Sequence, residues 1–420
     1  MNIPETDLPR IIVIGCGFAG LKFIKKVDTR QYQVVLFDEN NYHTFQPLMY
    51  QVATAGLEPD SIVYPIRKVF AGKKNFYFRL SKVDKVNTEH KTVRTDLGEL
   101  HYDHLIIATG ATNNFFGMDD MEKNSLPMKT LLESLDIRSR VLQNFENALQ
   151  TTDIQEREAL MGFVIVGGGP TGVELAGALA ELKRHVLPHD YPDLDVRRMQ
   201  IHVVEASDRL LSNMSQHASE KSEAFLRKLG VNVWLKTKVE GYDGHTVRTD
   251  NKDLQARTLV WSAGVQGRPV DGVEVEKRKG NRLAVDDFAR LRGMENVYAI
   301  GDVAAMSTEH YPDGHPMLAS VAGQQGDWLA KNLNRLAQGK EEKPFTYNDK
   351  GTMATVGRNL AVVDLDKWKF SGLFAWLVWM SVHLMLLVDF RSRLVVFVNW
   401  VWSYFKYDRG ARVIIRESRK

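Results

Sequence analysis

The sequence predicts an α/β fold with two Rossmann-like domains, followed by a C-terminal helical region. Three observations support this. Two Gly-x-Gly-x-x-Gly motifs each follow a β-branched run, at residues 11–14 and 163–166, and each precedes a helical pattern. The third is the apolar stretch GLFAWLVWMSVHLMLLVDF near the C-terminus. Strand, glycine turn and helix in this order form the phosphate-binding unit of doubly wound folds.

The first glycine motif lies in IIVIGCGFAGLKFIKK. Gly15 would make the tight turn, Gly17 would let the backbone approach a pyrophosphate, and Gly20 would let helix and strand pack closely. The next strand pattern, residues 33–37, ends in Asp38, which we expect to accept hydrogen bonds from ribose hydroxyls. The motif therefore predicts a bound dinucleotide.

The second glycine motif, in FVIVGGGPTGVELAGALAEL, has the same order, with Gly167, Gly169 and Gly172. The following strand, residues 201–204, ends in Glu205 after a longer interval that includes an inserted loop, HVLPHDYPDLD. A carboxylate at this place pairs with the ribose hydroxyls of NAD and repels a 2′-phosphate. We therefore expect NADH rather than NADPH.

Two dinucleotide folds in one chain predict two dinucleotides, one a permanently bound flavin and the other an exchangeable nicotinamide. Glu174, in the expected first turn of the second helix, has two interpretations. One is a partner of the helix dipole. The other is a carboxylate beside the nicotinamide or the flavin, with a role in catalysis.

Composition limits the function further. The formal net charge of +3 is too small to indicate a nucleic-acid partner, and the single cysteine, Cys16, excludes a disulfide framework and a dithiol redox centre. Residues 1–10 are polar and lack the apolar core of a signal peptide, so we expect the catalytic body on the cytoplasmic side. HYDHL at residues 101–105 looks metal-like but leads into a strand, and we predict no metal site.

Two further segments carry a family resemblance. LIIATGATNN brings Ala108, Thr109 and Gly110 to the end of a strand, and NVYAIGDVAAM brings Gly301 and Asp302 to the end of another, at a helix start. With the two glycine motifs, these segments resemble the two-dinucleotide-binding-domain flavoproteins. The resemblance implies that Asp302 holds the ribityl chain of FAD, in a discontinuous FAD domain into which the NAD domain is inserted.

Within this superfamily the chain resembles the type II NADH:quinone oxidoreductases, the non-proton-pumping respiratory NADH dehydrogenases. The similar segments are FQPLMYQVATAG, LASVAGQQG, DKGTMATVGR and a tail with FAWLVWMSVHL and RGARVI. One position departs from the family's Ala-Gln-x-x-x-Gln pattern. Ser320 stands where glutamine is expected beside the quinone, while Gln324 is present.

The resemblance implies a set of site residues. Glu174 and Lys350 are the catalytic candidates. Quinone would contact Gln46, Pro47, Ser320, Gln324 and Lys350. The two dinucleotides, tightly bound FAD and the electron donor NADH, would be held by Gly15, Gly17, Phe18, Ala19, Gly20, Asp38, Glu39, Gln46, Ala108, Thr109, Gly110, Gly301, Asp302, Gly167, Gly169, Pro170, Thr171, Gly172, Glu205, Ala263 and Gly264.

The same resemblance predicts four domain ranges. Residues 1–115 and 263–345 would form the FAD domain, residues 116–262 the NADH domain, and residues 346–420 a membrane-associating and dimerisation region. The implied acceptor is a membrane quinone of the menaquinone or ubiquinone type, reduced to quinol in a respiratory chain.

The sequence of the tail predicts two helices. Residues 373–388 are apolar except for Ser381 and His383, and sixteen residues rise about 24 Å, short of the roughly 30 Å of a bilayer core. In the next segment Asn399, Ser403 and Lys406 fall on one polar face of an amphipathic helix. We expect His383 to be a packing or interfacial residue.

These patterns favour two helices that lie in one leaflet of the inner (plasma) membrane, on its cytoplasmic face. Basic residues outnumber acids from Arg391 onward, which favours anionic head groups. Five tryptophans of the tail suit a membrane interface: Trp368, Trp376, Trp379, Trp400 and Trp402. The alternatives are packing against the body or a second subunit, and a transmembrane hairpin; a homodimer is compatible with the membrane-bound form.

Two other functions remain open from sequence. One is a flavoprotein reductase with a soluble acceptor, in which the tail only dimerises. The other is a nucleotide-binding redox sensor or membrane scaffold, because glycine motifs do not separate binding from catalysis.

Overall fold

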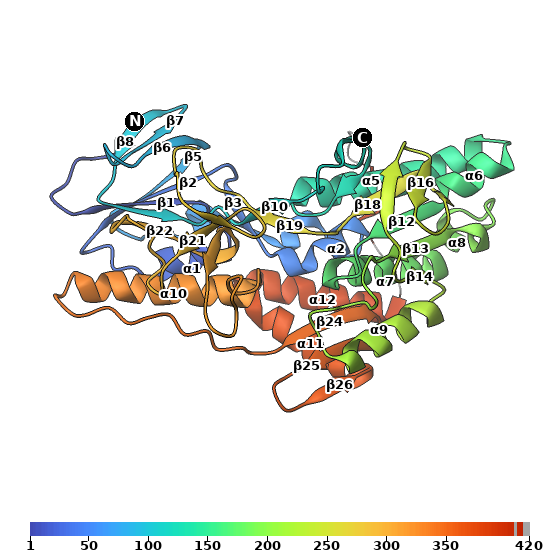
Figure 1. Ribbon diagram of the computed structural model, residues 1–420. Coiled ribbons are helices and arrows are strands. Elements are labelled where there is room, and N and C mark those ends of the chain that lie inside the picture. Colours follow the sequence, from blue (N-terminus) through green and yellow to red (C-terminus); the bar gives the residue numbers. More distant parts are fainter. Residues whose placement is uncertain (407–409, 415–420) are drawn as a thin grey trace. The chain divides into compact units, whose positions relative to one another are not determined.

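The computed structural model describes residues 1–406 and 410–414 (Figure 1). Within this part the chain forms two compact units. Unit 1 comprises Met1–Thr44, Val63–Thr112 and Val265–Asp349, and unit 2 comprises Phe45–Ile62, Asn113–Gly264 and the chain from Lys350 onward. The parallel sheets and the helices of both units confirm the α/β class. The four domain ranges given above stay a prediction.

Unit 1 is built on a five-stranded parallel sheet of order β22-β9-β1-β2-β5. Its central strand is fully buried, as the β-branched run predicts. Helices α1 and α10 pack against each other (Figure 1). The elements of this sheet and its helices are β1 (Arg10–Ile14), α1 (Phe18–Lys26), β2 (Gln33–Asp38), β5 (Phe76–Leu80), β9 (His104–Ile107), β22 (Val297–Ala299) and α10 (Ala319–Leu336).

Smaller elements complete unit 1. The expected helix start after β22 is a single 3₁₀ turn, η4 (Gly301–Val303), which leads into a strand. The other elements are β3 (Tyr42–Thr44), β4 (Val63–Pro65), α3 (Ile66–Val69), β6 (Val83–Asn87), β7 (Thr92–Thr95), β8 (Gly98–His101), β19 (Val265–Gly267), β20 (Lys277–Arg278), β21 (Arg282–Val285) and β23 (Ala304–Met306), with β10 (Ala111–Asn113), whose last residue belongs to unit 2.

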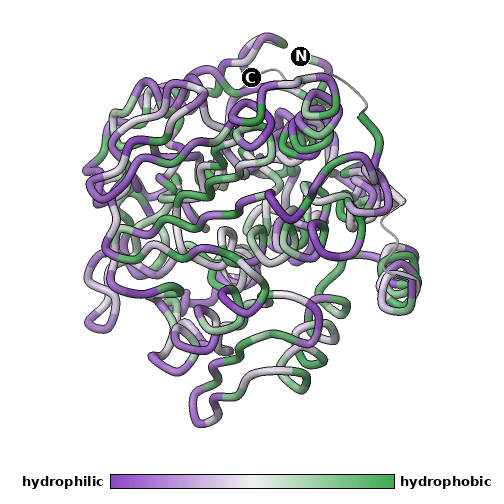
Figure 2. Tube along the Cα trace, turned by 90° about the vertical axis from the view of Figure 1, so that its right-hand side faces the viewer, coloured by the Kyte–Doolittle hydropathy of each residue, from purple (hydrophilic) through white to green (hydrophobic). Residues whose placement is uncertain are grey.

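Unit 2 has its own five-stranded parallel sheet, of order β11-β18-β12-β13-β14. The hydropathy colouring of Figure 2 shows hydrophobic stretches of chain separated by hydrophilic connections. The elements of this sheet and its helices are β11 (Leu126–Pro127), α5 (Leu131–Gln150), α6 (Ile154–Leu160), β12 (Gly162–Val166), α7 (Pro170–His185), α8 (Leu187–Asp190), β13 (Gln200–Val204), α9 (Gln216–Lys228), β14 (Asn232–Trp234) and β18 (Thr258–Trp261).

Side-chain caps define where two of these helices begin. Thr130 and Glu133 form a reciprocal capping box at the start of α5, and Ser215 caps α9. The inserted loop predicted after α7 contains the short helix α8. The remaining elements of unit 2 before the tail are η1 (Gln46–Leu48), α2 (Met49–Ala53), η2 (Pro59–Ser61), α4 (Asp119–Asn124), η3 (Val196–Arg198), β15 (Val239–Tyr242), β16 (Thr246–Thr249) and β17 (Leu254–Gln255).

The tail region of unit 2 begins with an antiparallel sheet, β24 (Thr352–Gly357), β25 (Leu360–Asp364) and β26 (Lys369–Ser371), whose first strand packs on α7. Gly177 permits this approach. A Cβ at Gly177 would lie 1.6 Å from the carbonyl oxygen of Val356. The contact between α7 and β24 therefore requires glycine at this position.

We expect Gly177→Ala to lower the stability of the holoenzyme by about 1–3 kcal/mol or more, because helix and strand must separate to admit the methyl group. Gly323→Ala on α10 is the matched control, because its Cβ would meet only the Lys22 side chain, at 3.7 Å. Alanine has the higher helix propensity, so the control should be neutral or stabilising. Thermal unfolding measures both; equal melting temperatures would contradict the packing argument.

Two helices follow, α11 (Leu373–Leu386) and α12 (Phe390–Lys406), close to the predicted segments. Each buries one narrow stripe. Ala375, Trp379 and His383, at four-residue spacing, are buried on α11, as are Ser392, Val396 and Trp400 on α12. Within the described residues, no helix combines the length and the apolar character needed to cross a membrane.

Of the five tryptophans of the tail, two are buried, two are exposed and Trp376 is intermediate, which corrects the expectation that all five suit an interface. Trp379 and Trp400 are only 2% and 9% exposed and pack with ring centroids 5.8 Å apart. Trp368 and Trp402 are 71% and 57% exposed. His383 is a packing residue, as predicted, and its ring stacks on Trp379. Of the tail's cationic residues, those at 409, 416, 419 and 420 lie outside the described residues.

Candidate active site

The first glycine motif of unit 1 forms an open cradle at the N-terminus of α1. Gly15 has φ +98°, and a Cβ there would lie 2.5 Å from the Ala108 carbonyl oxygen. A Cβ on Gly20 would lie 2.0 Å from the Gly15 carbonyl oxygen, whereas nothing lies within 4 Å of the corresponding position on Gly17. The open space therefore lies where a pyrophosphate would approach, next to the N–H groups of Phe18 and the following residues.

The other predicted flavin-site residues of unit 1 lie at the carboxyl ends of adjacent strands. Asp38 ends β2, and its carboxylate accepts the N–H of Cys16 at 2.6 Å and of Asn40 at 2.8 Å. Burial raises its pKa. Ala108, Thr109 and Gly110 follow β9, and Gly301 and Asp302 follow β22.

Two side chains of this group already have partners in unit 1. Glu39 pairs with the Arg268 guanidinium at 2.6 Å, and the Thr109 hydroxyl donates to the Arg268 carbonyl oxygen at 2.5 Å. Arg268 thus links the loops after β2 and β9, where both predicted residues lie. Their contact with a dinucleotide stays a prediction.

The second glycine motif repeats the geometry in unit 2. Gly167 has φ +109°, and a Cβ on Gly172 would lie 2.0 Å from the Gly167 carbonyl oxygen. Nothing lies within 4 Å of a Cβ on Gly169, the residue before Pro170 and Thr171 open α7. On the neighbouring strand, Ala263 and Gly264 follow β18.

Glu205 stands one residue beyond β13. One carboxylate oxygen accepts the N–H of Gly168 at 2.6 Å, and the other accepts the N–H of Ser207 at 2.7 Å. Both contacts fix the carboxylate at the edge of the glycine cradle. A negative charge held there disfavours a 2′-phosphate.

We expect Glu205→Gln to reduce the preference for NADH over NADPH by about tenfold or more, a change of about 1.4 kcal/mol in relative transition-state binding. The amide keeps one acceptor for the loop while the charge is removed. Steady-state kcat/KM for both nucleotides measures the change. A preference that stays as in the wild type would show that another group selects the nucleotide.

Glu174 is the fifth residue of α7 and so lies beyond its first turn, which corrects the expected position. The helix dipole acts within the first turn, so the dipole interpretation loses support. Its carboxylate accepts the backbone N–H of Thr355 at 3.4 Å. The side chain is half-buried because it faces a cavity, yet the protein around it raises the pKa of Glu174 to about 8 through burial, against the lowering effect of the Thr355 bond.

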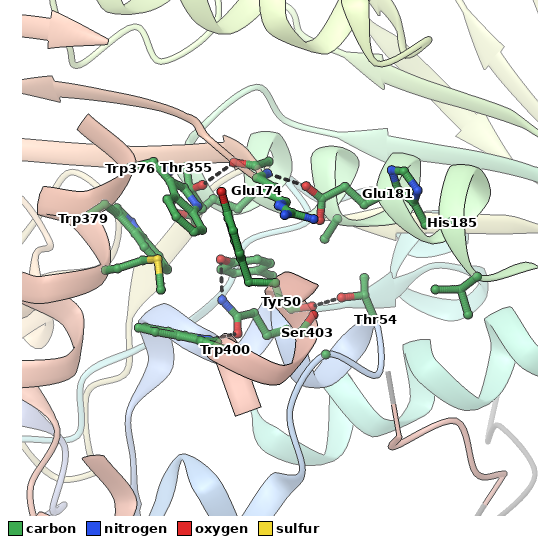
Figure 3. Close-up of a pocket in the computed structure, with 18 residues that line it drawn as sticks. Tyr50, Thr54, Glu174, Glu181, His185, Thr355, Trp376, Trp379, Trp400 and Ser403 are labelled. Atoms are coloured by element: carbon green, nitrogen blue, oxygen red, sulfur yellow. Dashed lines mark hydrogen bonds between the residues drawn. The ribbon is translucent and has the colours of Figure 1, made fainter. Parts of the chain in front are cut away.

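That cavity, of about 110 Å³, lies entirely within unit 2 (Figure 3). One wall is polar and comes from α7 and β24 with the turn that follows. The other is mainly aromatic and comes from α2, α11 and α12. The polar wall has Glu174, Ala178, Glu181, His185, Thr355 and Arg358, and the aromatic wall has Tyr50, Trp376, Trp379, Met380, Trp400 and Tyr404.

Hydrogen bonds order the aromatic wall, and a cation–π contact links it to the polar wall. The Trp400 indole donates to Gln51 at 2.8 Å, and Gln51 donates to the Tyr50 hydroxyl at 2.8 Å (Figure 3). The Arg358 guanidinium lies 3.7 Å from the centre of the Tyr404 ring. Sequence reasoning identified Glu174 but not these neighbours, although Glu181 and His185 share its helix face at i+7 and i+11.

The residues predicted to contact quinone belong to both units. Gln46, Pro47 and Lys350 are in unit 2, and Ser320 and Gln324 are in unit 1. Within unit 1 the Gln324 amide exchanges two hydrogen bonds with the backbone of Asn348, at 2.9 and 3.0 Å. The Ser320 hydroxyl lies 3.2 Å from that of Tyr347. The common quinone site stays a prediction.

Comparison with known proteins decides the family. Residues 9–326 match the pyridine nucleotide-disulphide oxidoreductase family, and residues 350–407 match the NDH2 C-terminal domain. The chain is 33% identical to the type II NADH:quinone oxidoreductase Ndh of Mycobacterium tuberculosis, over 96% of this chain and 90% of that protein. The chain belongs to the type II NADH:quinone oxidoreductases.

A second relative supports this assignment, and a solved structure shows the same fold. The second type II NADH:quinone oxidoreductase of M. tuberculosis, NdhA, is 32% identical over 96% of this chain and 89% of its own length. The fold matches NDH2 from Plasmodium falciparum in complex with NADH with a TM-score of 0.89 at 23% identity, over 97% of this chain and all of that one.

As a member of the type II NADH:quinone oxidoreductases, the chain uses FAD and NADH, and its two cradles fit them. Each has the open glycine, the positive-φ turn and the strand-end carboxylate that a dinucleotide requires. Cys16 is buried with its pKa raised, and it stands alone, so this member lacks the dithiol of the disulphide oxidoreductases in the wider family.

Proposed function

We propose that the protein oxidises NADH on a membrane surface and reduces a quinone there to quinol, without pumping protons, as an entry point of a respiratory chain. NADH oxidation with quinone reduction is the activity of its family, and FAD supplies the hydride-accepting chemistry. The observation that carries the proposal is the pair of dinucleotide cradles in a chain with one buried cysteine. Electrons then pass to the acceptor without a protein dithiol.

The chain's own residues bind and orient the reactants. In unit 2 the glycine cradle and Glu205 hold NADH by its pyrophosphate and ribose. In unit 1, Asp38 would bind the ribose hydroxyls of FAD, and Asp302 would hold its ribityl chain. We include Gln46, Pro47, Ser320, Gln324 and Lys350 in the quinone site on the strength of the family resemblance.

Glu174 is the proposed proton donor of the reaction. A general acid works best with a pKa near the working pH, and the pKa of Glu174 is about 8. It therefore carries a proton at neutral pH and releases it without a large energetic cost. Lys350, which is exposed at the start of the tail region, is proposed to tune the charge of the reacting groups.

The proposed membrane contact is the exposed side of α11 and α12. Outside the buried stripes these helices expose large apolar side chains, a composition that favours lipid over water. Basic residues border them: Arg391 and Lys406 on α12, and Lys367 and Lys369 beside Trp368 at the β25–β26 turn. The exposed apolar residues are Leu373, Phe374, Leu377, Val382, Met385, Leu386, Phe390, Leu394, Val395, Phe397, Val398, Val401, Trp402 and Phe405.

This pattern supports contact with an anionic lipid surface, and we propose that this surface is the cytoplasmic face of the inner membrane. Tryptophan and lysine at the edge of an apolar surface are typical of membrane interfaces. A homodimer through part of the same region is also proposed, since membrane-bound subunits can pair while the rest of the surface meets lipid. The mass of the protein in detergent, by light scattering, decides between one copy and two.

The choice of acceptor tests the function. NADH oxidation is measured with a quinone embedded in anionic vesicles and, separately, with a soluble iron–sulfur protein. Rapid turnover with the quinone alone supports the proposal. Rapid turnover with the protein acceptor alone would make the chain a soluble-acceptor reductase, and negligible turnover with either would indicate a sensor or scaffold.

A further inference from the structure

The reaction has a proton requirement that NADH does not meet. Reduction of a quinone to quinol takes two electrons and two protons, whereas NADH becomes NAD⁺ by giving up two electrons and one proton. One further proton per turnover therefore comes from water. If Glu174 delivers that proton, as proposed above, it must be reprotonated from solvent after each turnover.

Helix α7 places three titratable side chains on one wall of the cavity. Glu174, Glu181 and His185 all line it, and Figure 3 shows them following one another along the helix. Their spacing of i, i+7 and i+11 keeps them on one face, with about 10 Å between the first two along the axis. His185 is the last residue of α7.

The space between the two carboxylates is suited to water. Ala178 is the i+4 residue between them and leaves room that a longer side chain would fill. The whole cavity, with a volume of about 110 Å³, corresponds to roughly four waters at about 30 Å³ each. Links of about 2.8 Å through two or three waters cover most of the interval between Glu174 and Glu181. Thr54 and Ser403 also line the cavity and bring hydroxyl groups to it.

We propose that Glu181 and His185 form, with water in the cavity, the path by which protons from solvent reach Glu174. The proposal rests on the proton-donor role of Glu174 given above. His185, at the end of α7, is the entry, Glu181 is the intermediate group, and the aromatic wall confines the waters to the polar face of the helix. Each transfer moves one proton along a hydrogen bond and leaves the groups ready for the next turnover.

Glu181 also has a structural contact, which the test must separate from proton transfer. Its carboxylate accepts the backbone N–H of Arg358 in the turn after β24. Glutamine at this position keeps an acceptor for that N–H but cannot carry the proton. Aspartate keeps the titratable group with a shorter reach. Glu181→Gln and Glu181→Asp therefore distinguish the two roles.

The experiment follows proton uptake and quinol formation together. NADH-reduced holoenzyme is mixed with a short-chain quinone in weakly buffered solution that contains a pH-indicator dye. In the wild type the two signals should coincide. Glu181→Gln should slow both by about tenfold or more, His185→Gln should slow them less, and Glu181→Asp should recover most of the rate. Small weak acids such as formic acid should accelerate Glu181→Gln but not the wild type.

Two controls decide the outcome. Glu220→Gln removes an exposed carboxylate on α9 that does not line the cavity, and its rates should equal those of the wild type. A slow Glu174→Gln with a normal Glu181→Gln would overturn the path while leaving the donor in place. Normal rates in both would overturn the donor role itself. A slow Glu181→Gln that weak acids do not accelerate would make Glu181 a structural residue and overturn the path.

Discussion

Glu174→Gln should lower the rate of quinol formation by about 10²-fold while FAD stays bound and NADH binding is retained. General acid–base groups contribute about 10²–10⁴-fold, and the amide has nearly the same shape but cannot donate the proton. The Thr355 N–H keeps an acceptor, so the contact between α7 and β24 should survive. The measurement is kcat with a saturating quinone, alongside the flavin absorbance of the purified variant.

The pH dependence gives the direction of the effect. Because the pKa of Glu174 is about 8, wild-type activity that depends on its proton should be level below this value and should fall above it. The variant should lack this limb. The charged or titratable groups that share the cavity are Glu181, His185, Arg358, Tyr50 and Tyr404. A variant that keeps both the rate and the alkaline limb would remove Glu174 from the mechanism.

The same pKa predicts a separate effect on stability. Burial raises the pKa of Glu174 from 4.5 to about 8, so between these values the folded state holds a proton that the unfolded state has released. The free energy of unfolding therefore falls as pH rises through this interval. Glu174→Gln should flatten that fall. Melting temperatures across the interval test this without any turnover.

The second large effect concerns the exposed side of α11 and α12, the proposed membrane contact. Trp402→Glu combined with Phe405→Glu should reduce binding to anionic vesicles by about 10²-fold or more. Each large apolar side chain contributes about 1.5–3 kcal/mol when buried, and 1.4 kcal/mol corresponds to a factor of ten. NADH oxidation with a soluble acceptor should be unchanged, whereas turnover with vesicle-embedded quinone should be largely lost.

The control pair is Leu132→Glu with Ile154→Glu, which replaces side chains of comparable exposure, 48% and 59%, on α5 and α6. Vesicle co-sedimentation with phosphatidylglycerol-rich and with pure phosphatidylcholine vesicles measures binding and its charge dependence. Equal loss in both pairs would mean that the α12 face has no special affinity for lipid. Unimpaired binding of the Trp402 and Phe405 pair, with a shift from dimer to monomer, would identify that face as a subunit interface.

The parts of the fold that could be predicted depend on local signals. The β-branched run before Gly15 forms β1. The motif glycines either have a positive φ or leave space where the dinucleotide approaches, and both are requirements of the local backbone. The residues that surround Glu174 depend instead on tertiary packing. Thr355 reaches it because Gly177 lets β24 rest on α7, a contact between distant parts of the chain that no local pattern encodes.

The tail shows the same limit. Its apolar character predicted two helices, yet composition did not separate the buried Trp379 and Trp400 from the exposed Trp368 and Trp402. The division follows from which narrow stripe of each helix packs on the rest of unit 2. Trp400 donates a hydrogen bond to Gln51. Asn399, expected on the polar face of an amphipathic helix, donates to Glu58 at 2.8 Å. Helical periodicity alone does not determine which stripe finds such partners.

The most direct test of quinone as the electron acceptor is an anaerobic stopped-flow experiment on the detergent-solubilised protein. One equivalent of NADH is added to the holoenzyme, the reduced protein is mixed with a short-chain quinone, and flavin absorbance is followed. We predict reduction by NADH followed by reoxidation much faster with quinone than with oxygen. Rapid reduction by NADH without reoxidation by quinone would contradict the assignment of quinone as acceptor and indicate a protein acceptor.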